Sequence, residues 1–259
     1  MMTGTVDLLT PDAVAQLLIL AYAPGVHAVS VVWNATRGDA NQWSDIDVHV
    51  YVRLASQKQD ARSAFMSGRL VTITTDTVDG SRAELKTPAR AVWAVPAIRD
   101  MRILLDQEQQ LAALKLEAEA FDWSALRAEA EASECRRLMA SAEYVYKIRA
   151  AIERRDESAA LHAAGALVRR CTRAIVTARG VFIRTENEYY RRAQEAAGAE
   201  WATRHRQCFA LAPDGPLALD AFAQAFAACE LYAETVRVLD DILDADARDV
   251  ALRAVAVLA

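Results

Sequence analysis

The chain contains 259 residues, 53% of them hydrophobic and 25% charged, and is therefore long and apolar enough to bury one large core or two smaller ones. This composition excludes a disordered or fibrous protein. The 30 Lys and Arg residues against 35 Asp and Glu residues give a formal charge of −5, so the overall charge does not recruit the chain to DNA, RNA or anionic lipid.

Charges interrupt every hydrophobic stretch, and no run approaches the roughly 20 apolar residues that a membrane-spanning helix needs. The first 20 residues include Asp7 and Asp12 but no basic segment, which is atypical of a secretion signal, and we therefore expect a cytoplasmic protein. Four cysteines lie far apart and form no C-x-x-C pair, at Cys135, Cys171, Cys208 and Cys229. We expect buried free thiols rather than a zinc site or a disulfide framework.

The first 110 residues combine strand and helix patterns. Three runs of alternating β-branched residues predict strands, at residues 27–33, 46–52 and 69–75. Helical spacing predicts three helices, at residues 11–22, 54–66 and 88–95. Thr10 is the expected N-cap of the first helix, because Pro11 suits a first helical turn. A further apolar run at residues 102–106 ends this half.

From about residue 107 the pattern changes, because Gly and Pro nearly vanish and Ala, Leu, Glu and Arg recur at helical spacing. Gly180 and Gly198 are expected to end helices, and a turn at residues 212–216 precedes final helices at 217–243 and 246–258. We therefore predict an α+β chain with a small mixed-sheet domain at residues 1–110 and an all-α helical bundle domain at residues 111–259.

Two carboxylates, Asp45 and Asp47, stand two residues apart at the start of an otherwise apolar strand and must face one side. Two buried like charges on a sheet face are costly unless a cation compensates them. Mg²⁺ prefers oxygen ligands, usually one or two protein carboxylates with substrate phosphates and waters. The same spacing is equally typical of two solvated aspartates at an exposed strand edge, so the residues alone leave both interpretations open.

The segment Val32–Val50 resembles the nucleotidyltransferase superfamily typified by DNA polymerase β. In small bacterial members of this superfamily, a strand leads into a polar loop with a glycine and then into S-D-[IL]-D. Gly38 and the run Ser44-Asp45-Ile46-Asp47 stand at these spacings without a gap. The helical half is also similar to the C-terminal domain of bacterial kanamycin and aminoglycoside nucleotidyltransferases. The resemblance implies that Asp45 and Asp47 hold Mg²⁺.

The loop departs from the family pattern at its first two positions, where Trp33 and Asn34 stand in place of Gly and Ser. A glycine there lets the backbone approach a nucleotide phosphate, and a serine offers a hydroxyl. Asn34 can still donate a hydrogen bond, and Arg37 can pair with a phosphate oxygen or stay solvated. By the resemblance, Asn34, Arg37 and Ser44 are the expected nucleotide-binding residues of the loop.

The family carries a third carboxylate on the next strand, and the strand at 69–75 has no acid in its centre. Asp76 is an even number of residues from Leu70, Thr72 and Thr74, so its side chain could face the same side of the sheet as the aspartate pair. It is the expected further metal ligand. Glu84 is a weaker substitute. His49 shares strand parity with Asp47 and either flanks the metal or fills a mixed face.

Glu143 and Lys147 lie four residues apart, and therefore on one face of a predicted helix. This spacing is ordinary helix stabilisation. It also resembles a helix of kanamycin nucleotidyltransferase, and that resemblance implies Glu143 as the base for an acceptor hydroxyl and Lys147 as a phosphate ligand. The pairs Arg169-Arg170 and Arg191-Arg192 are typical of solvated helix faces, or one of them lines a groove for an acidic substrate.

The resemblance implies an enzyme that uses Mg²⁺ and an NTP, with ATP as the first expectation, and transfers a nucleoside monophosphate to a hydroxyl of a small molecule such as an aminoglycoside-like antibiotic. The expected partners are the nucleotide and the acceptor, without DNA or a membrane, and a homodimer is left open. One alternative is a catalytically impaired module that binds a nucleotide or a protein. Another is a toxin–antitoxin component.

Overall fold

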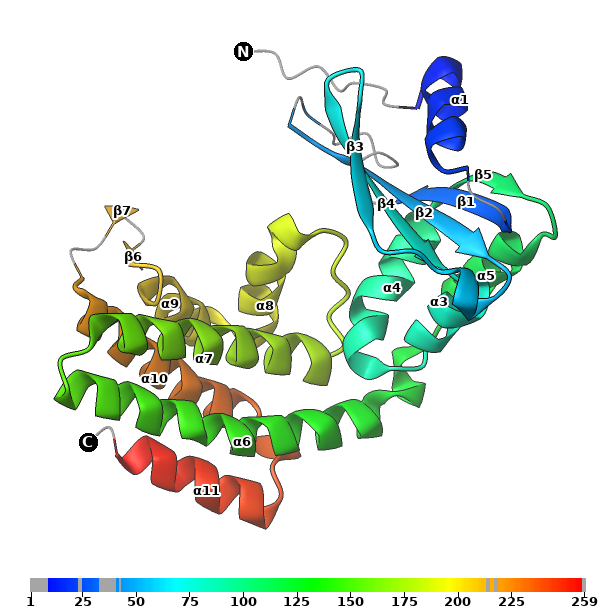
Figure 1. Cartoon of the computed structure of the whole chain (residues 1–259). Helices are drawn as coiled ribbons and strands as arrows, with labels where there is room; N and C mark the ends of the chain where they lie inside the picture. Colours follow the sequence, from blue (N-terminus) through cyan, green and yellow to red (C-terminus); the bar gives the residue numbers. More distant parts are fainter. Residues whose placement is uncertain are drawn as a thin grey trace. The chain divides into compact units, whose positions relative to one another are not determined.

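The computed structural model describes residues 9–22, 25–32, 41, 43–212, 215–216 and 219–257. The chain divides into two compact units, the first made of Met1–Asp122 with Phe182–Glu186 and the second of Trp123–Val181 with Asn187–Ala259 (Figure 1). This division falls after Asp122 and not at residue 110. The predicted α+β class is confirmed. Among the described residues, no helix has the length and apolar character that crossing a bilayer requires.

The first unit is built on a five-stranded mixed sheet with the strand order β3-β4-β2-β1-β5. β2 runs parallel to β4, and the other neighbouring strands are antiparallel. The strands are β1 (Val26–Val32), β2 (Ile46–Val52), β3 (Arg62–Met66), β4 (Arg69–Asp76) and β5 (Arg102–Asp106). All three predicted strands are present, and β2 is the central one.

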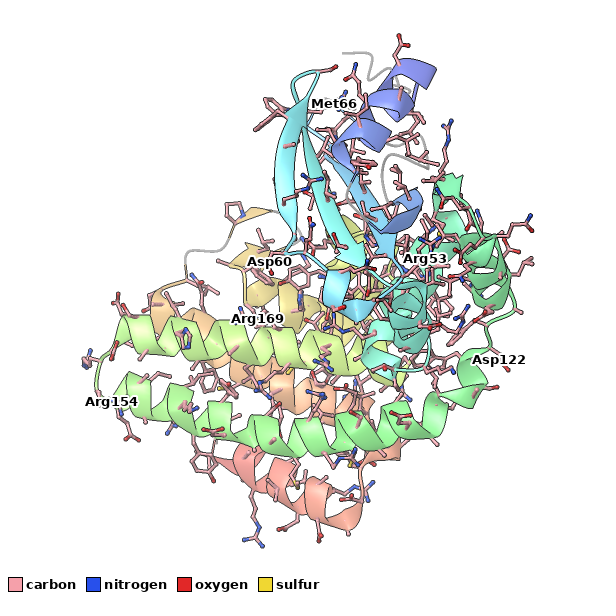
Figure 2. The ribbon with its side chains drawn as sticks, turned by 45° about the vertical axis from the view of Figure 1, so that its right-hand side comes forward. Arg53, Asp60, Met66, Asp122, Arg154 and Arg169 are labelled. Atoms are coloured by element: carbon pink, nitrogen blue, oxygen red, sulfur yellow. The ribbon has the colours of Figure 1, made fainter. Side chains whose placement is uncertain are left out.

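The prediction of a helix at residues 54–66 was wrong. The segment forms a short 3₁₀ turn, η1 (Ala55–Gln57), and then the edge strand β3, whose last residue Met66 is labelled in Figure 2. Ser67 and Gly68 both have positive φ, 51° and 79°, and two consecutive residues of this kind form the tight turn that matches the twist of a hairpin. The Ser-Gly turn therefore makes β3 and β4 a hairpin.

Strand alternation gives the sheet two different faces. One face packs against α1 (Pro11–Leu20) in an apolar core that includes Leu17, Ile46, Val48 and Val50. Thr10 caps α1 as predicted, because its hydroxyl accepts a hydrogen bond from the Ala13 amide at 3.3 Å. The other face meets α3 (Val78–Glu84) and α4 (Pro88–Asp100) around a small cavity, and α5 (Gln110–Glu119) packs against α4.

The second unit is helical in its described residues, apart from the two-residue strands β6 (Leu211–Ala212) and β7 (Gly215–Pro216). Its helices are α6 (Arg127–Glu153), α7 (Glu157–Ala178), α8 (Tyr189–Ala197), α9 (Ala199–Gln207), α10 (Ala221–Val238) and α11 (Ala245–Ala256). α7 packs against both α6 and α10. Gly180 and Gly198 follow α7 and α8 with positive φ, as predicted.

Polar caps define where several of these helices begin. The carboxylates of Asp156, Asp220 and Asp244 accept hydrogen bonds from the third amide of α7, α10 and α11 at 2.8 to 2.9 Å. The four cysteines are free thiols, three of them buried and Cys208 half-buried. Burial raises the pKa of the Cys171 thiol to about 12, so it is protonated and inert at neutral pH.

Candidate functional site

Asp45 and Asp47 lie at the start of the central strand, on the face opposite the α1 core. Ile46, Val48 and Val50 alternate with them and are at most 2% exposed. Asp47 is therefore on the α3 and α4 side of the sheet, between Val32 of β1 and Thr72 of β4. The neighbouring strands fix this carboxylate on a rigid part of the fold and offer it no charge of opposite sign.

No positive charge among the described residues compensates the two carboxylates. Within the described ranges, neither has a hydrogen bond or an ion pair. Asp47 is half-buried, and its pKa is raised from 3.8 to about 6, first by burial and then by the negative charges of Asp45 and Glu186. An uncompensated pair of oxygen donors on one face is a donor set that suits Mg²⁺, which usually takes one or two protein carboxylates.

Glu186 is a residue that the sequence interpretation missed. It belongs to the segment Phe182–Glu186, which returns to the first unit. This segment is fixed against α4, because the Ile183 amide donates to the Val92 carbonyl at 2.8 Å and Arg184 pairs with Asp100 at 2.8 Å. Local sequence patterns carry no signal for this approach, since it depends on a distant segment folding back.

The described residues do not assemble a larger metal cluster. Among them, no group of three or more His, Cys, Asp and Glu side chains could hold a metal ion. Glu186 is exposed, and its effect on Asp47 is that of a nearby negative charge. The site is therefore an aspartate pair with an acidic neighbour.

The structure places Asp76 away from this pair. On the parallel strands β2 and β4, Asp47 stands beside Thr72, whereas Asp76 stands beside Tyr51. Four residues of strand separate the two levels, which amounts to about 13 Å at roughly 3.3 Å per residue. The Asp76 carboxylate forms an ion pair with Lys58 and accepts a hydrogen bond from the Thr77 amide.

Ser44 lies in the turn before Asp45. Its hydroxyl accepts a hydrogen bond from the Asn41 amide at 2.9 Å, and the Arg69 guanidinium donates to the carbonyls of Asn41 and Ser44 at 2.7 and 3.2 Å. Ser44 and Arg69 therefore stabilise the turn that leads into the aspartate pair. The other expected loop residues, Trp33, Asn34, Arg37 and Gly38, lie outside the described residues.

A cavity of about 90 Å³ lies on the same face of the sheet as Asp47. Its polar lining residues are His49, Tyr51, Ser81 and Glu84, and apolar side chains of α4 form much of the rest. Burial lowers the pKa of His49 and raises that of Glu84, so both groups are biased towards their neutral forms. His49 thus lines this cavity on the face of the sheet that also carries Asp47.

Glu143 and Lys147 lie on α6 of the second unit, where they form an ion pair at 2.6 Å. Both side chains are more than half exposed. The hydrogen bond from Lys147 holds the pKa of Glu143 below its usual value, which disfavours proton uptake while the pair persists. In this conformation the two residues make the ordinary helix-stabilising contact that their spacing also predicts.

No family model matches the chain, and no curated protein matches it. Among solved structures, the chain is similar to a nucleotidyltransferase-like protein from Exiguobacterium sibiricum 255-15. The TM-score is 0.48 and the sequence identity is 14%, over 89% of this chain and 74% of that one. A similarity of this degree assigns no activity to the chain and no role to its residues.

Proposed function

We propose that the chain is a Mg²⁺-dependent nucleotidyltransferase, which transfers a nucleoside monophosphate from an NTP to a hydroxyl of a small acceptor. The observation that carries the proposal is the uncompensated pair of Asp45 and Asp47 on one face of the central strand. The resemblance of the run Ser44–Asp47 to the nucleotidyltransferase motif supports the same assignment. ATP is the first nucleotide to test.

The chain's own residues have three tasks in this proposal. Asp45 and Asp47 would hold the ion at a fixed point of the sheet, and Ser44 and Arg69 keep the preceding turn in place. An ion held by these two carboxylates would neutralise phosphate charge. The acceptor oxygen forms a bond to the α-phosphorus, the bond to the bridging oxygen breaks, and pyrophosphate leaves with its electrons.

The acceptor hydroxyl must also lose a proton during the transfer. We keep Glu143 as the proposed base and Lys147 as the proposed phosphate ligand, on the strength of the resemblance alone. Their mutual ion pair has to open before Glu143 can take the proton.

Metal-dependent nucleotide binding tests the proposal. ATP is titrated into the full chain with Mg²⁺ or with EDTA, and the same titrations are made with a double Asp45→Asn, Asp47→Asn variant. Asp60→Asn is the control, because Asp60 is exposed and belongs to the same unit. We expect binding that needs Mg²⁺, is lost in the double variant and is kept in the control. Equal binding by the double variant would remove the proposed ion site.

A nucleotide-binding module without turnover is the second candidate. It is favoured by the described carboxylates, which do not form a cluster of three, and by the Trp33-Asn34 departure in the loop. Incubation with labelled NTPs and a panel of hydroxylated acceptors, including an aminoglycoside, separates the two candidates. Labelled product and pyrophosphate release support the enzyme, whereas Mg²⁺-dependent binding without either supports the module.

A further inference from the structure

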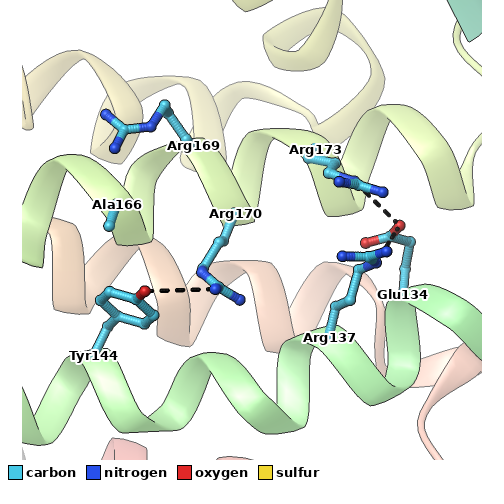
Figure 3. Close-up of a pocket in the computed structure, with 7 residues that line it drawn as sticks. All are labelled: Glu134, Arg137, Tyr144, Ala166, Arg169, Arg170 and Arg173. Atoms are coloured by element: carbon cyan, nitrogen blue, oxygen red, sulfur yellow. Dashed lines mark hydrogen bonds and ion pairs between the residues drawn. The ribbon is translucent and has the colours of Figure 1, made fainter. Parts of the chain in front are cut away.

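A basic pocket of about 340 Å³ lies in the second unit between α6 and α7 (Figure 3). Each helix contributes residues three, four or seven positions apart, so that two stripes of side chains face each other. The lining residues are Glu134, Arg137 and Tyr144 from α6, and Ala166, Arg169, Arg170 and Arg173 from α7. Four guanidinium groups against one carboxylate give the lining a net charge of +3.

Glu134 fixes one end of the pocket. Its side chain is 1% exposed, and its Oε1 atom lies 3.4 Å from Nε of Arg137 and 3.6 Å from Nε of Arg173. Both carboxylate oxygens lack a hydrogen bond in the described structure, so these contacts are ion pairs rather than hydrogen bonds. A single carboxylate held in this way orients two arginines and neutralises only one of them.

At the other end, Arg169 and Arg170 form no ion pair with a carboxylate among the described residues, and the nearest acidic influence is that of Glu143, whose pKa Arg170 helps to lower. The Arg170 guanidinium lies 4.7 Å from the centre of the Tyr144 ring and donates to its hydroxyl at 3.4 Å. Arg169 is exposed, and its guanidinium forms no ion pair with a carboxylate of the described residues. Other arginines of this unit pair with carboxylates, as Arg179 does with Asp241 at 2.7 Å and Arg253 with Asp249 at 2.8 Å.

The charge gathered here is unusual for a chain with a net charge of −5. Guanidinium groups bind phosphate oxygens with two parallel hydrogen bonds. A hollow of this volume is within the range of small-molecule sites, whereas a nucleic-acid surface needs a longer basic track. The sequence interpretation left open whether an arginine pair lines a groove for an acidic substrate, and the structure puts Arg169 and Arg170 in such a position.

We propose that the α6–α7 pocket binds the phosphoryl groups of a small molecule, with Arg170 and Arg173 as its central ligands and Arg137 and Arg169 at its sides. The phosphoryl groups can belong to a nucleotide or to another phosphorylated metabolite. This binding needs neither the aspartate pair of β2 nor a metal ion, and it therefore does not rest on the proposed function.

Calorimetric titration of the full chain in EDTA and low salt tests the pocket, with inorganic pyrophosphate and tripolyphosphate as probes. We expect one site per chain, weakened at least about tenfold by Arg170→Gln, because charged hydrogen bonds contribute roughly this much or more. Arg170→Lys keeps the charge and should restore part of the binding. Arg253→Gln is the matched control, since it removes the same charge from an exposed position on α11 and should change affinity less than about twofold.

Two further variants keep the outcomes distinct. The double Asp45→Asn, Asp47→Asn variant should retain binding in EDTA, so the pocket and the proposed function can fail separately. If Arg170→Gln does not fold, Arg169→Gln replaces an exposed arginine and carries the same expectation.

ATP binding that matches tripolyphosphate points to the nucleotide as the source, and weaker ATP binding points to another phosphorylated molecule. Equal affinities for wild type and Arg170→Gln, or an equal loss in Arg253→Gln, would overturn the proposal.

Discussion

Replacing Asp47 by Asn is expected to stabilise the ion-free first unit at neutral pH and to remove its response to Mg²⁺. Burial and nearby negative charges raise the pKa of Asp47 from 3.8 to about 6 in the folded protein. At about 1.36 kcal/mol per pKa unit, this shift corresponds to at most about 3 kcal/mol of lost stability. Because Asp47 is partly exposed, solvent screening reduces the expected gain to about 1–2 kcal/mol.

The sign of the pH dependence follows from proton binding. Between pH 3.8 and about 6 the folded state holds more protons on Asp47 than the unfolded state does. The free energy of unfolding is therefore not lowered by Asp47 below pH 3.8, where the carboxyl is protonated in both states. It decreases as the pH rises to about 6, because the buried carboxyl must then lose its proton. Asn does not titrate, so the variant should exceed wild type above pH 6 and lose this advantage towards pH 4.

Urea unfolding at pH 4.5 and pH 8, in EDTA and in millimolar Mg²⁺, measures both effects, with Asp60→Asn as the matched charge control. Mg²⁺ should raise the stability of wild type and of the control, because a ligand that binds only the folded state stabilises it. Equal stability of wild type and Asp47→Asn at pH 8 would refute the burial cost. Equal stabilisation of the variant by Mg²⁺ would place the ion elsewhere.

Three other substitutions have defined outcomes. Glu143→Gln should lower turnover by about 100-fold or more while leaving Mg²⁺-dependent ATP binding unchanged, because a base acts on the chemical step. Thr235→Val should lower the free energy of unfolding by about 1–3 kcal/mol, since it orphans the buried indole N–H of Trp201, which donates to the Thr235 hydroxyl at 2.8 Å. Gly180→Ala should destabilise by more than about 1 kcal/mol, because the residue has a φ of 62° and its added methyl would overlap a neighbouring indole ring.

Each of these expectations has its own control or contradiction. Full turnover in Glu143→Gln would exclude that residue as the base. Thr172→Val removes an equally buried hydroxyl that donates only to its own helix, to the Val168 carbonyl at 2.8 Å, and urea unfolding should show a smaller loss than for Thr235→Val. Gly198→Ala has a φ of 96° but open space around it, so a thermal melt should show a smaller shift than for Gly180→Ala.

The strands were predictable where side-chain alternation and burial agree. β2 begins directly after Asp45 and alternates half-buried Asp47 and His49 with buried Ile46 and Val48, as a strand with one apolar face does. β3 was missed because it is an edge strand with mostly exposed side chains, so no buried stripe distinguished it from a surface helix. The Ser67-Gly68 turn was the available signal, since two such residues between apolar runs favour a hairpin.

The candidate site was predictable only where it is local in sequence. Asp45 and Asp47 are fixed by strand parity, which a motif reveals directly. Asp76 lies away from the pair because the register between β2 and β4 places it beside Tyr51 rather than beside Asp47. The alternation of side chains along one strand predicts which face a residue is on, but not which residue of the next strand stands beside it. Glu186 depends on a segment that returns from the helical half, and no local pattern reports a contact of such sequence separation.

The basic pocket bears on the choice of acceptor. An aminoglycoside is a polycation, and a lining with a net charge of +3 around Arg170 repels it. The α6–α7 pocket is therefore not the place where an aminoglycoside-like acceptor would bind, and such a substrate would need a different, acidic surface. A phosphorylated molecule suits this lining instead, because guanidinium groups bind phosphate oxygens with paired hydrogen bonds. The charge of the lining thus favours anionic over cationic ligands in the α6–α7 pocket.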